Sequence, residues 1–463
     1  MFTPSADIIL LLQSFSCCFT SPAFSKMVLL VCGAILTPGR RTVASALRAV
    51  GRSSSKTFGS YHRLLSRDRW SALGASKYLW SLLLENFIPR DQAIDIVVDE
   101  TLERRRGKKI EYKGWFRDAV RSTRASVVTT SGIRWLCFCV LAPVPWSIRR
   151  WALPFLTFPC QSEKTCAKRK RAHRGSAGLT IDGLIEIRKW IGTERLLRLI
   201  ADGGFTNMEL LHFCKSLNVT QIGRLRIDAK IYDEPDNAPN KPGPRSKKGK
   251  RQPSFKDRIA SGIGLDWRTV ELALNDGNLR TLQIASGVSL WHVPNFDPVR
   301  LRWVVVRPSE GGSIKEAAAF FSTDITMGDE QIVALYAERW NIEVFFEEVR
   351  ACLGFETQRG WTNRTIGRTT PCLFGIFSLV VILAKRLYPT GLPCRKAAWY
   401  AKEQATFRDV LAIVREHLWE HGFAVQEINQ EVENAIGSAK NADHRLIPAA
   451  LIAAVREMAC YAA

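Results

Sequence analysis

The chain has 463 residues, 46% of them hydrophobic, and it contains 14 Trp and 23 Phe. This apolar content provides for a buried core and excludes a disordered chain, and the length predicts about two to four domains. The formal net charge of +22, from 66 Lys and Arg against 44 Asp and Glu, is typical of proteins that bind a polyanion. Nucleic-acid binders, ribosomal proteins and membrane-surface proteins all share such a charge.

The cysteines and the apolar runs indicate in which cellular compartment the protein is expected. The twelve cysteines are scattered without a C-x-x-C pair, which favours reduced, buried thiols in a cytosolic protein over a disulfide framework. Residues 8–19 are apolar, but Asp7 precedes them without a basic leader, so we expect no secretory signal. The apolar run 372–384 is shorter than the ~20 residues of a spanning helix. We expect a buried core helix there and no membrane partner.

Residues 20–85 are predicted to form helices. Apolar positions recur at helical spacing, and the segments 37–39 (TPG) and 51–55 (GRSSS) interrupt them. Thr42 is expected to cap the second of three short helices. Their ends carry the basic residues Arg40, Arg41, Arg48, Arg52 and Lys56. Region 1–90 is therefore interpreted as a helix-turn-helix-like DNA reader, and a helical bundle with a solvated basic rim is the alternative.

The pattern changes to α/β from residue 93. Residues 94–98 are β-branched and predict a strand that ends at Asp99, and two further strands are expected at 125–130 and 133–141, joined at Ser131-Gly132. A basic loop (161–178) follows, which contains the tract 168–171. The predicted elements after it are a helix at 179–191, a strand at 196–201, a helix at 207–217 and a strand at 219–223. Region 91–224 is thus predicted to be the first part of an α/β core.

Residues 225–325 are predicted to form a β-rich insertion with strands at 279–284, 289–293 and 301–306. Its loop, 237–254, is crowded with Pro and Lys. We interpret four of its basic residues as DNA backbone contacts, with a solvated tether as the alternative: Lys247, Lys248, Lys250 and Arg251. A long helix at 330–353 is expected in the second part of the core (326–390), and the region 391–463 is expected to be helical.

Carboxylates gather at three points of this pattern. Asp99 and Asp202 directly follow predicted strands, where α/β folds place their chemistry. On the predicted helix 330–353, Tyr336, Arg339, Glu343 and Arg350 share a polar stripe beside an apolar one. Glu347 lies close to that stripe, so helical geometry alone does not choose between Glu343 and Glu347. Three such acids suit two divalent ions that activate a water or a 3′-hydroxyl for phosphoryl displacement.

The spacing Tyr336-x2-Arg339-x3-Glu343-x6-Arg350 resembles the Tyr-x2-Arg-x3-Glu-x6-Lys signature of bacterial insertion-sequence DDE transposases, in the RNase H-like superfamily. The segments that begin at Asp99 (DETLERRRGKK) and surround Asp202 (ADGGF) are similar to the first and second Asp regions of that family. The resemblance implies that Asp99, Asp202 and Glu343 are the catalytic, metal-binding acids, and it favours Glu343 over Glu347. Arg350 departs from the usual Lys, which keeps the charge but changes its geometry.

The resemblance also implies a fold and a reaction. The fold would be α/β: an RNase H-like mixed-sheet core with an all-α N-terminal region, a β-rich insertion and a helical C-terminus. The enzyme would be an endonuclease and strand transferase that uses two Mg²⁺ ions, with Mn²⁺ as a substitute. Tyr336, Arg339 and Arg350 would contact DNA. Its partners would be double-stranded DNA of transposon ends and target and further copies of itself, in a homodimer or higher multimer. The expected location is the bacterial cytoplasm, on the nucleoid.

Two other functions fit the same residues. One is a structure-specific nuclease on the same core, and the other is a non-catalytic DNA-binding protein derived from a transposase, which would have no need of three acids. The pattern His417-x-x-Glu420-His421 matches an inverted zinc-protease motif. Amphipathic packing already explains that helix, so we expect no zinc there.

Overall fold

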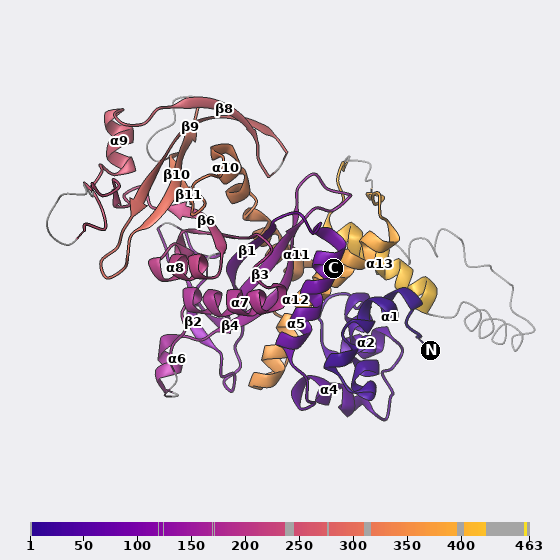
Figure 1. Ribbon diagram of the computed structural model, residues 1–463. Coiled ribbons are helices and arrows are strands. Elements are labelled where there is room, and N and C mark those ends of the chain that lie inside the picture. Colours follow the sequence, from indigo (N-terminus) through magenta and orange to yellow (C-terminus); the bar gives the residue numbers. More distant parts are fainter. Residues whose placement is uncertain are drawn as a thin grey trace, which may run out of the picture.

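The computed structural model describes residues 2–422, apart from 119, 124, 169, 171, 237–244, 276, 310–315 and 396–401, together with residues 458–460. Half of the basic tract 168–171, the first part of the basic loop 237–254 and most of the predicted helical region 391–463 therefore lie outside the described residues. The remaining segments form a mixed sheet with helices around it (Figure 1).

The N-terminal region is helical, as the apolar spacing predicts. Thr42 caps its helix by accepting a hydrogen bond from the Ser45 N–H at 3.1 Å, which confirms the predicted cap. Ile8, Leu11 and Leu12 are buried, so the apolar segment 8–19 packs into the hydrophobic core. The elements are α1 (Ala6–Gln13), η1 (Ser16–Cys18), α2 (Ser21–Leu36), α3 (Val43–Ala49), α4 (Phe58–Ser66) and α5 (Ala72–Phe87).

The core sheet has the strand order β4-β3-β1-β5-β6, in which β1, β3 and β4 are antiparallel and β5 and β6 are parallel to β1. This mixed arrangement is the RNase H-like core that the resemblance implies. The strands are β1 (Ile94–Arg104), β2 (Gly114–Arg117), β3 (Thr129–Ala142), β4 (Trp151–Cys160), β5 (Leu197–Ala201) and β6 (Val219–Leu225). The interspersed helices are α6 (Glu163–Lys168), α7 (Ser176–Ile191), η2 (Gly203–Phe205) and α8 (Met208–Ser216). The short strand β2 and the whole of β4 were not predicted.

Strand β1 continues past Asp99, so the prediction that it ends there is wrong. The sequence turns charged after Asp99, yet pairing with β3 persists to Arg104 opposite Gly132. Glu103 is only 1% exposed and accepts hydrogen bonds from Trp135 Nε1 at 2.7 Å and Thr370 Oγ1 at 3.1 Å. Because these partners satisfy the buried carboxylate, the strand can carry charge inside the protein.

Strand β3 is a single strand, so the predicted turn at Ser131-Gly132 is also wrong, and residues 125–128 lie outside it. A Cβ on Gly132 would lie 2.4 Å from the Glu103 carbonyl oxygen of β1. The glycine therefore permits a close approach of two backbones within the sheet. A comparable glycine, Gly287, lies inside another strand that the sequence pattern divides in two.

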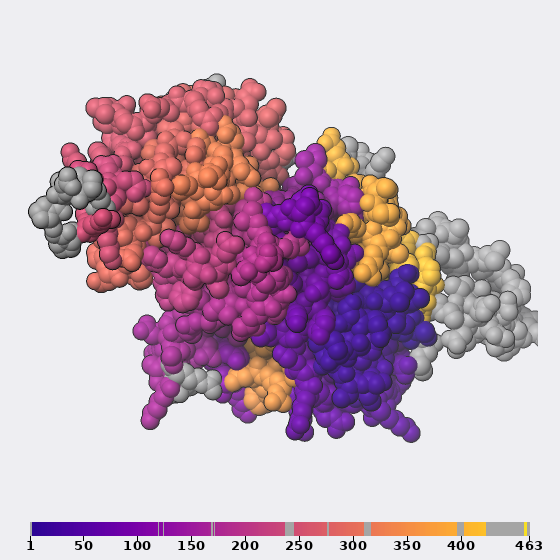
Figure 2. Space-filling model, viewed as in Figure 1, coloured from indigo at the N-terminus to yellow at the C-terminus, as the bar shows by residue number. Residues whose placement is uncertain are grey.

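The insertion extends the core sheet, because its last strand pairs with β6. Its elements are β7 (Ile231–Tyr232), α9 (Phe255–Ser261), β8 (Arg268–Ala273), β9 (Leu279–Trp291), β10 (Val299–Pro308) and β11 (Ala318–Ser322). Strand β9 runs without a break through Gly287, where two strands were predicted; a Cβ there would lie 2.6 Å from the Trp303 ring. Figure 2 shows this part as a lobe that projects from the core, on the side away from the N-terminal helices.

The predicted long helix at 330–353 consists of two helices, α10 (Asp329–Ala337) and α11 (Trp340–Leu353). At the break, hydrogen bonds span three residues instead of four, from Asn341 N to Glu338 O at 3.0 Å and from Ile342 N to Arg339 O at 3.1 Å. Tyr336 thus belongs to α10 and Glu343 to α11, so a single straight helix does not describe the four signature positions.

Helix α12 (Asn363–Leu387) contains the apolar run 372–384. By length and composition it could cross a membrane, but 72% of its most apolar window is buried inside the protein. It packs against α5 and β4, so the prediction of a buried core helix is confirmed. The last described helix of more than one turn, α13 (Phe407–Gly422), packs on α12 and α2. None of the twelve cysteines forms a disulfide, all of them lying in the described residues, and most are buried.

Candidate active site

Asp99 projects from the middle of β1 and is the most perturbed of the predicted acids. Its side chain is 19% exposed. Burial raises its pKa from 3.8 to about 7, against the opposing effects of Arg339 and of the Glu100 N–H. The negative charges of Asp202 and Glu343 also contribute to the raised pKa. Each of these two acids therefore lies close enough to Asp99 to act on its charge.

Asp202 follows β5 directly, as predicted. Val98 pairs with Ala201 in the parallel register, so Asp99 and Asp202 extend from neighbouring strands at the same level. Oδ1 of Asp202 accepts a hydrogen bond from the Gly204 N–H at 2.8 Å. This bond fixes the orientation of the carboxylate and leaves Oδ2 with no partner in the described residues.

Glu343 lies in the first turn of α11, on the side of Asp99, whereas Glu347 is exposed one turn later. Of the two acids that helical spacing leaves open, Glu343 is thus the one that the fold brings to Asp99. Arg339 joins the acids: its Nη1 lies 2.9 Å from Asp99 Oδ2, and its Nη2 lies 2.6 Å from Glu343 Oε1. The guanidinium is the positive charge between β1 and α11.

Tyr336 lies beside this group on α10. Its ring packs on Phe320 with centroids 4.5 Å apart, and the Arg339 guanidinium lies 6.0 Å from the ring centre. Burial raises the pKa of the Tyr336 phenol. Tyr336 and Arg339 are thus the two predicted DNA contacts that the fold brings to the acids.

Arg350 is partly buried, with its side chain 27% exposed, and it is bonded within the protein. Its Nη2 donates to Thr101 Oγ1 at 2.5 Å and to the Leu102 carbonyl at 3.2 Å, both on β1, and its Nε lies 3.4 Å from Glu356. Burial lowers its pKa. These bonds tie α11 to the strand that carries Asp99, and they occupy the guanidinium.

The four predicted basic contacts of the insertion lie away from the acids, beside β7 and the end of β9. Lys247, Lys250 and Arg251 are exposed, and Lys247 pairs with Asp297. Lys248 is partly buried: its Nζ lies 2.9 Å from His292 Nδ1 and 4.3 Å from the centre of the Tyr232 ring.

Two other residues that the sequence analysis named, Arg41 and His417, form contacts within the protein. Arg41, placed on the basic rim of the N-terminal helices, is only 6% exposed, so its assignment to a basic surface is wrong. His417 Nε2 lies 3.1 Å from Asp7 Oδ2, which links α13 to α1. The described residues contain no group of three His, Cys, Asp or Glu that could hold a metal ion, His417 and His421 included.

Sequence reasoning missed a charged cluster beneath the helix break. Asp95, 2% exposed, pairs with Arg198 and with Arg150 Nη1 at 2.6 Å, and Arg150 also pairs with Glu338, the residue before Arg339. Burial raises the pKa of Glu338, and Arg150 opposes the shift. Asp95 could have been noticed, because it is a charged residue inside the apolar run IDIVV.

Acids on the central strand, after its parallel neighbour and on a later helix of an RNase H-like sheet define the DDE class of polynucleotidyl transferases and nucleases. The chain belongs to the DDE superfamily endonuclease family, whose model matches residues 14–289. Residues 312–390 match a second family, described as an archaeal ISC1217 transposase. Together the matches identify an insertion-sequence DDE transposase. No curated protein is similar enough to count as a match.

Proposed function

We propose that the protein cuts DNA at transposon ends and joins the freed ends to target DNA in a metal-dependent reaction. One observation carries the proposal: Asp202, at the end of β5, and Glu343, on α11, each act on the charge of Asp99 on β1, and Arg339 pairs with both Asp99 and Glu343. A protein that only bound DNA would gain nothing from a group of carboxylates that repel the phosphates.

The donor set suits Mg²⁺, which prefers carboxylate oxygens and keeps several waters, and it suits Mn²⁺ as a substitute. As arranged, no three such groups in the described chain surround one point, and the cation between Asp99 and Glu343 is Arg339. The site thus already stabilises a positive charge, which supports its fit to metal ions. Metal binding would require Arg339 to release at least one of the two carboxylates.

Two divalent ions bound by these acids would activate the attacking water or 3′-hydroxyl and stabilise the leaving oxygen. The protein's own contribution begins with orientation: the Gly204 N–H holds Asp202, and the ladder between β1 and β5 sets its spacing from Asp99. Tyr336 and a released Arg339 would contact the phosphates beside the cut. Arg350, bonded to β1, would position α11 and contact DNA only after those bonds break.

The DNA partner would be the double-stranded transposon end and then the target. Lys247, Lys250 and Arg251 would contact its backbone from the insertion lobe, with Lys248 beside them. Synapsis of two ends requires at least a homodimer. We infer action in the bacterial cytoplasm, on the nucleoid.

A cleavage assay on DNA that carries the ends of the element, with Mg²⁺, tests this proposal. Wild type, Glu343→Gln and Glu347→Gln would be compared, with DNA binding measured in parallel. We expect Glu343→Gln to abolish cutting without loss of DNA binding, and Glu347→Gln to cut normally. Glu347 is the matched control, because it lies on the same helix and faces solvent.

The alternatives give different outcomes. Cutting without joining to target DNA would indicate a structure-specific nuclease. A wild-type protein that binds its own ends and never cuts them, or a Glu343→Gln variant that cuts normally, would overturn the proposed catalytic site.

A further inference from the structure

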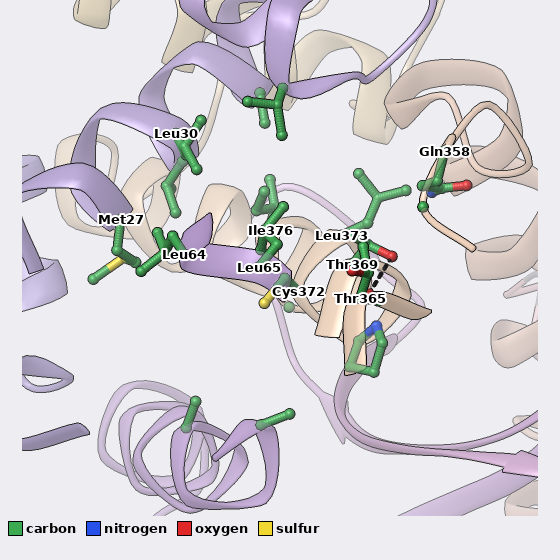
Figure 3. Close-up of a pocket in the computed structure, with 18 of the residues that line it drawn as sticks. Met27, Leu30, Leu64, Leu65, Gln358, Thr365, Thr369, Cys372, Leu373 and Ile376 are labelled. Carbon is green, nitrogen blue, oxygen red and sulfur yellow. Dashed lines mark hydrogen bonds between the residues drawn. The ribbon is translucent and has the colours of Figure 1, made fainter. Parts of the chain in front are cut away.

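A cavity of about 540 Å³ lies between the N-terminal helices and α12, and none of the three acids lines it. This volume is in the range of small-molecule sites. Figure 3 shows Met27, Leu30 and Leu64 toward one end, Gln358 at the other, and Leu65 and Ile376 between them. Most of the lining is apolar, so the cavity suits an aliphatic or aromatic body.

The charged groups of the lining are all basic. Arg41 and Arg359 contribute to it, and none of the described residues that line it is Asp or Glu. The sign of the charge therefore selects against a cationic ligand.

Arg41 is a buried cation. In the described part of the chain, its guanidinium donates only to backbone carbonyls: to Ala34 at 3.3 Å, to Cys352 at 2.6 Å and to Gly39. No carboxylate of the described residues forms an ion pair with it, in contrast to Arg150, which pairs with Asp95 and Glu338. Burial, together with the charge of the nearby Arg415, lowers the pKa of Arg41 to about 9. A charge buried in this way is costly unless an anion compensates it.

Gln358 supplies a second, independent observation at the same end of the cavity. Its side chain is buried, with the residue 7% exposed, and neither Nε2 nor Oε1 has a hydrogen-bond partner among the described residues. It lies close to Arg41, because the Arg41 N–H donates to Thr357 Oγ1 at 2.9 Å. A buried carboxamide without a partner destabilises the protein, and a ligand head group that accepts from its NH₂ would remove the part of that cost that falls on the NH₂.

We propose that this cavity binds a small amphipathic anion of the fatty-acid class, with its carboxylate beside Arg41 and Gln358 and its aliphatic chain among the apolar side chains. The ligand would compensate the Arg41 charge and accept from the Gln358 NH₂ at once. Arg41 also holds the Cys352 carbonyl at the end of α11, so the bound ligand would strengthen the contact between the N-terminal helices and that helix. The inference is independent of the proposed catalytic activity.

Calorimetric titration of the full-length protein with decanoate, below its micelle concentration, tests the proposal. Decan-1-ol carries the chain without the charge, and acetate carries the charge without the chain. We expect decanoate to bind with one site per chain, about 10-fold more tightly than decan-1-ol, and acetate to show no saturable binding. Ala75→Phe places an aromatic ring in the space of the aliphatic chain, because Ala75 lines the cavity, and it should abolish binding of decanoate.

Gln358→Leu is the decisive variant, since the Gln358 side chain makes no bond within the protein. Its ligand-free melting temperature should stay unchanged or rise, while its affinity for decanoate falls about 10-fold. The exposed Gln92→Leu is the matched control and should bind as wild type does. The proposal is overturned if decanoate does not saturate, if decan-1-ol binds equally well, or if Gln358→Leu binds decanoate as tightly as wild type.

Discussion

Arg339 and Asp99 form an ion pair of 2.9 Å between the helix break and the middle of β1. The pair places a cation against an acid that burial would otherwise leave protonated, because the positive charge opposes the rise in the pKa of Asp99. The same guanidinium reaches Glu343. Metal ions and Arg339 would therefore compete for the same two carboxylates, and both would favour their ionised form.

The raised pKa of Asp99 predicts a pH-dependent stability of the metal-free protein. Between its ordinary value of 3.8 and about 7, the folded protein keeps a proton on Asp99 that the unfolded chain has lost. The unfolding free energy should therefore fall as pH rises through this window, by at most ~1.4 kcal/mol per pH unit. Asp99→Asn, which cannot titrate, should lack this fall.

Urea unfolding at pH 5 and pH 8, in the presence of a chelator, measures the effect. From pH 5 to pH 8, the unfolding free energy of wild type should fall relative to that of Asp99→Asn. Asp91→Asn, which changes an exposed residue, should show the same change in unfolding free energy as wild type. Parallel behaviour of all three proteins would show that Asp99 titrates as an ordinary carboxyl.

Arg150 is predicted to be a positioning residue for the helix break. Arg150→Met would leave Glu338 without its partner and Asp95 with Arg198 alone. Because a charge left unpaired in the interior is costly, we expect a loss of about 2–3 kcal/mol in unfolding free energy. DNA cleavage should fall as Arg339 and Glu343 lose their placement, and Arg150→Lys should restore part of both.

Chemical denaturation and the cleavage assay, run on the same preparations, check this prediction. Arg226→Met breaks a pair with Asp228 in which the arginine is 85% exposed, and it should change neither quantity. If Arg150→Met is as stable and as active as wild type, the cluster does not position the break.

Much of the site could be predicted because its signals are local. Asp202 follows a short, mostly apolar run, and Glu343 belongs to a four-residue spacing. The errors arose where a residue's partner is distant in the chain. Glu103 continues β1 because it bonds Trp135 and Thr370, and the helix breaks near Glu338 where Arg150 pairs with it. No local pattern contains those partners.

Gly132 and Gly287 lie where the sequence pattern predicted breaks between strands, and they provide a third prediction. An added Cβ would lie 2.4 Å from the Glu103 carbonyl oxygen at Gly132 and 2.6 Å from the Trp303 ring at Gly287. Backbone and indole cannot move aside easily, so Gly132→Ala and Gly287→Ala should each lower the unfolding free energy by about 1–3 kcal/mol. Gly367→Ala, in α12 with nothing within 4 Å, should stabilise the protein by about 1 kcal/mol or less. Stabilisation at all three positions would contradict the close approaches within the sheet.

The salt dependence of DNA binding distinguishes basic residues that contact phosphates from basic residues that are bonded within the protein. Each lysine or arginine that neutralises a phosphate contributes about −0.9 to the slope of log affinity against log salt. Lys250→Ala and Arg251→Ala remove exposed charges on the insertion lobe, so each should make the slope shallower by roughly that amount.

Arg350→Met removes a charge already bonded to Thr101, Leu102 and Glu356, so the slope should stay the same while stability falls. Fluorescence anisotropy between ~50 and ~200 mM salt measures all three variants. A flat wild-type dependence would contradict a basic DNA-binding face, and a slope that changes only for Arg350→Met would place the phosphate contacts at α11 instead of the insertion.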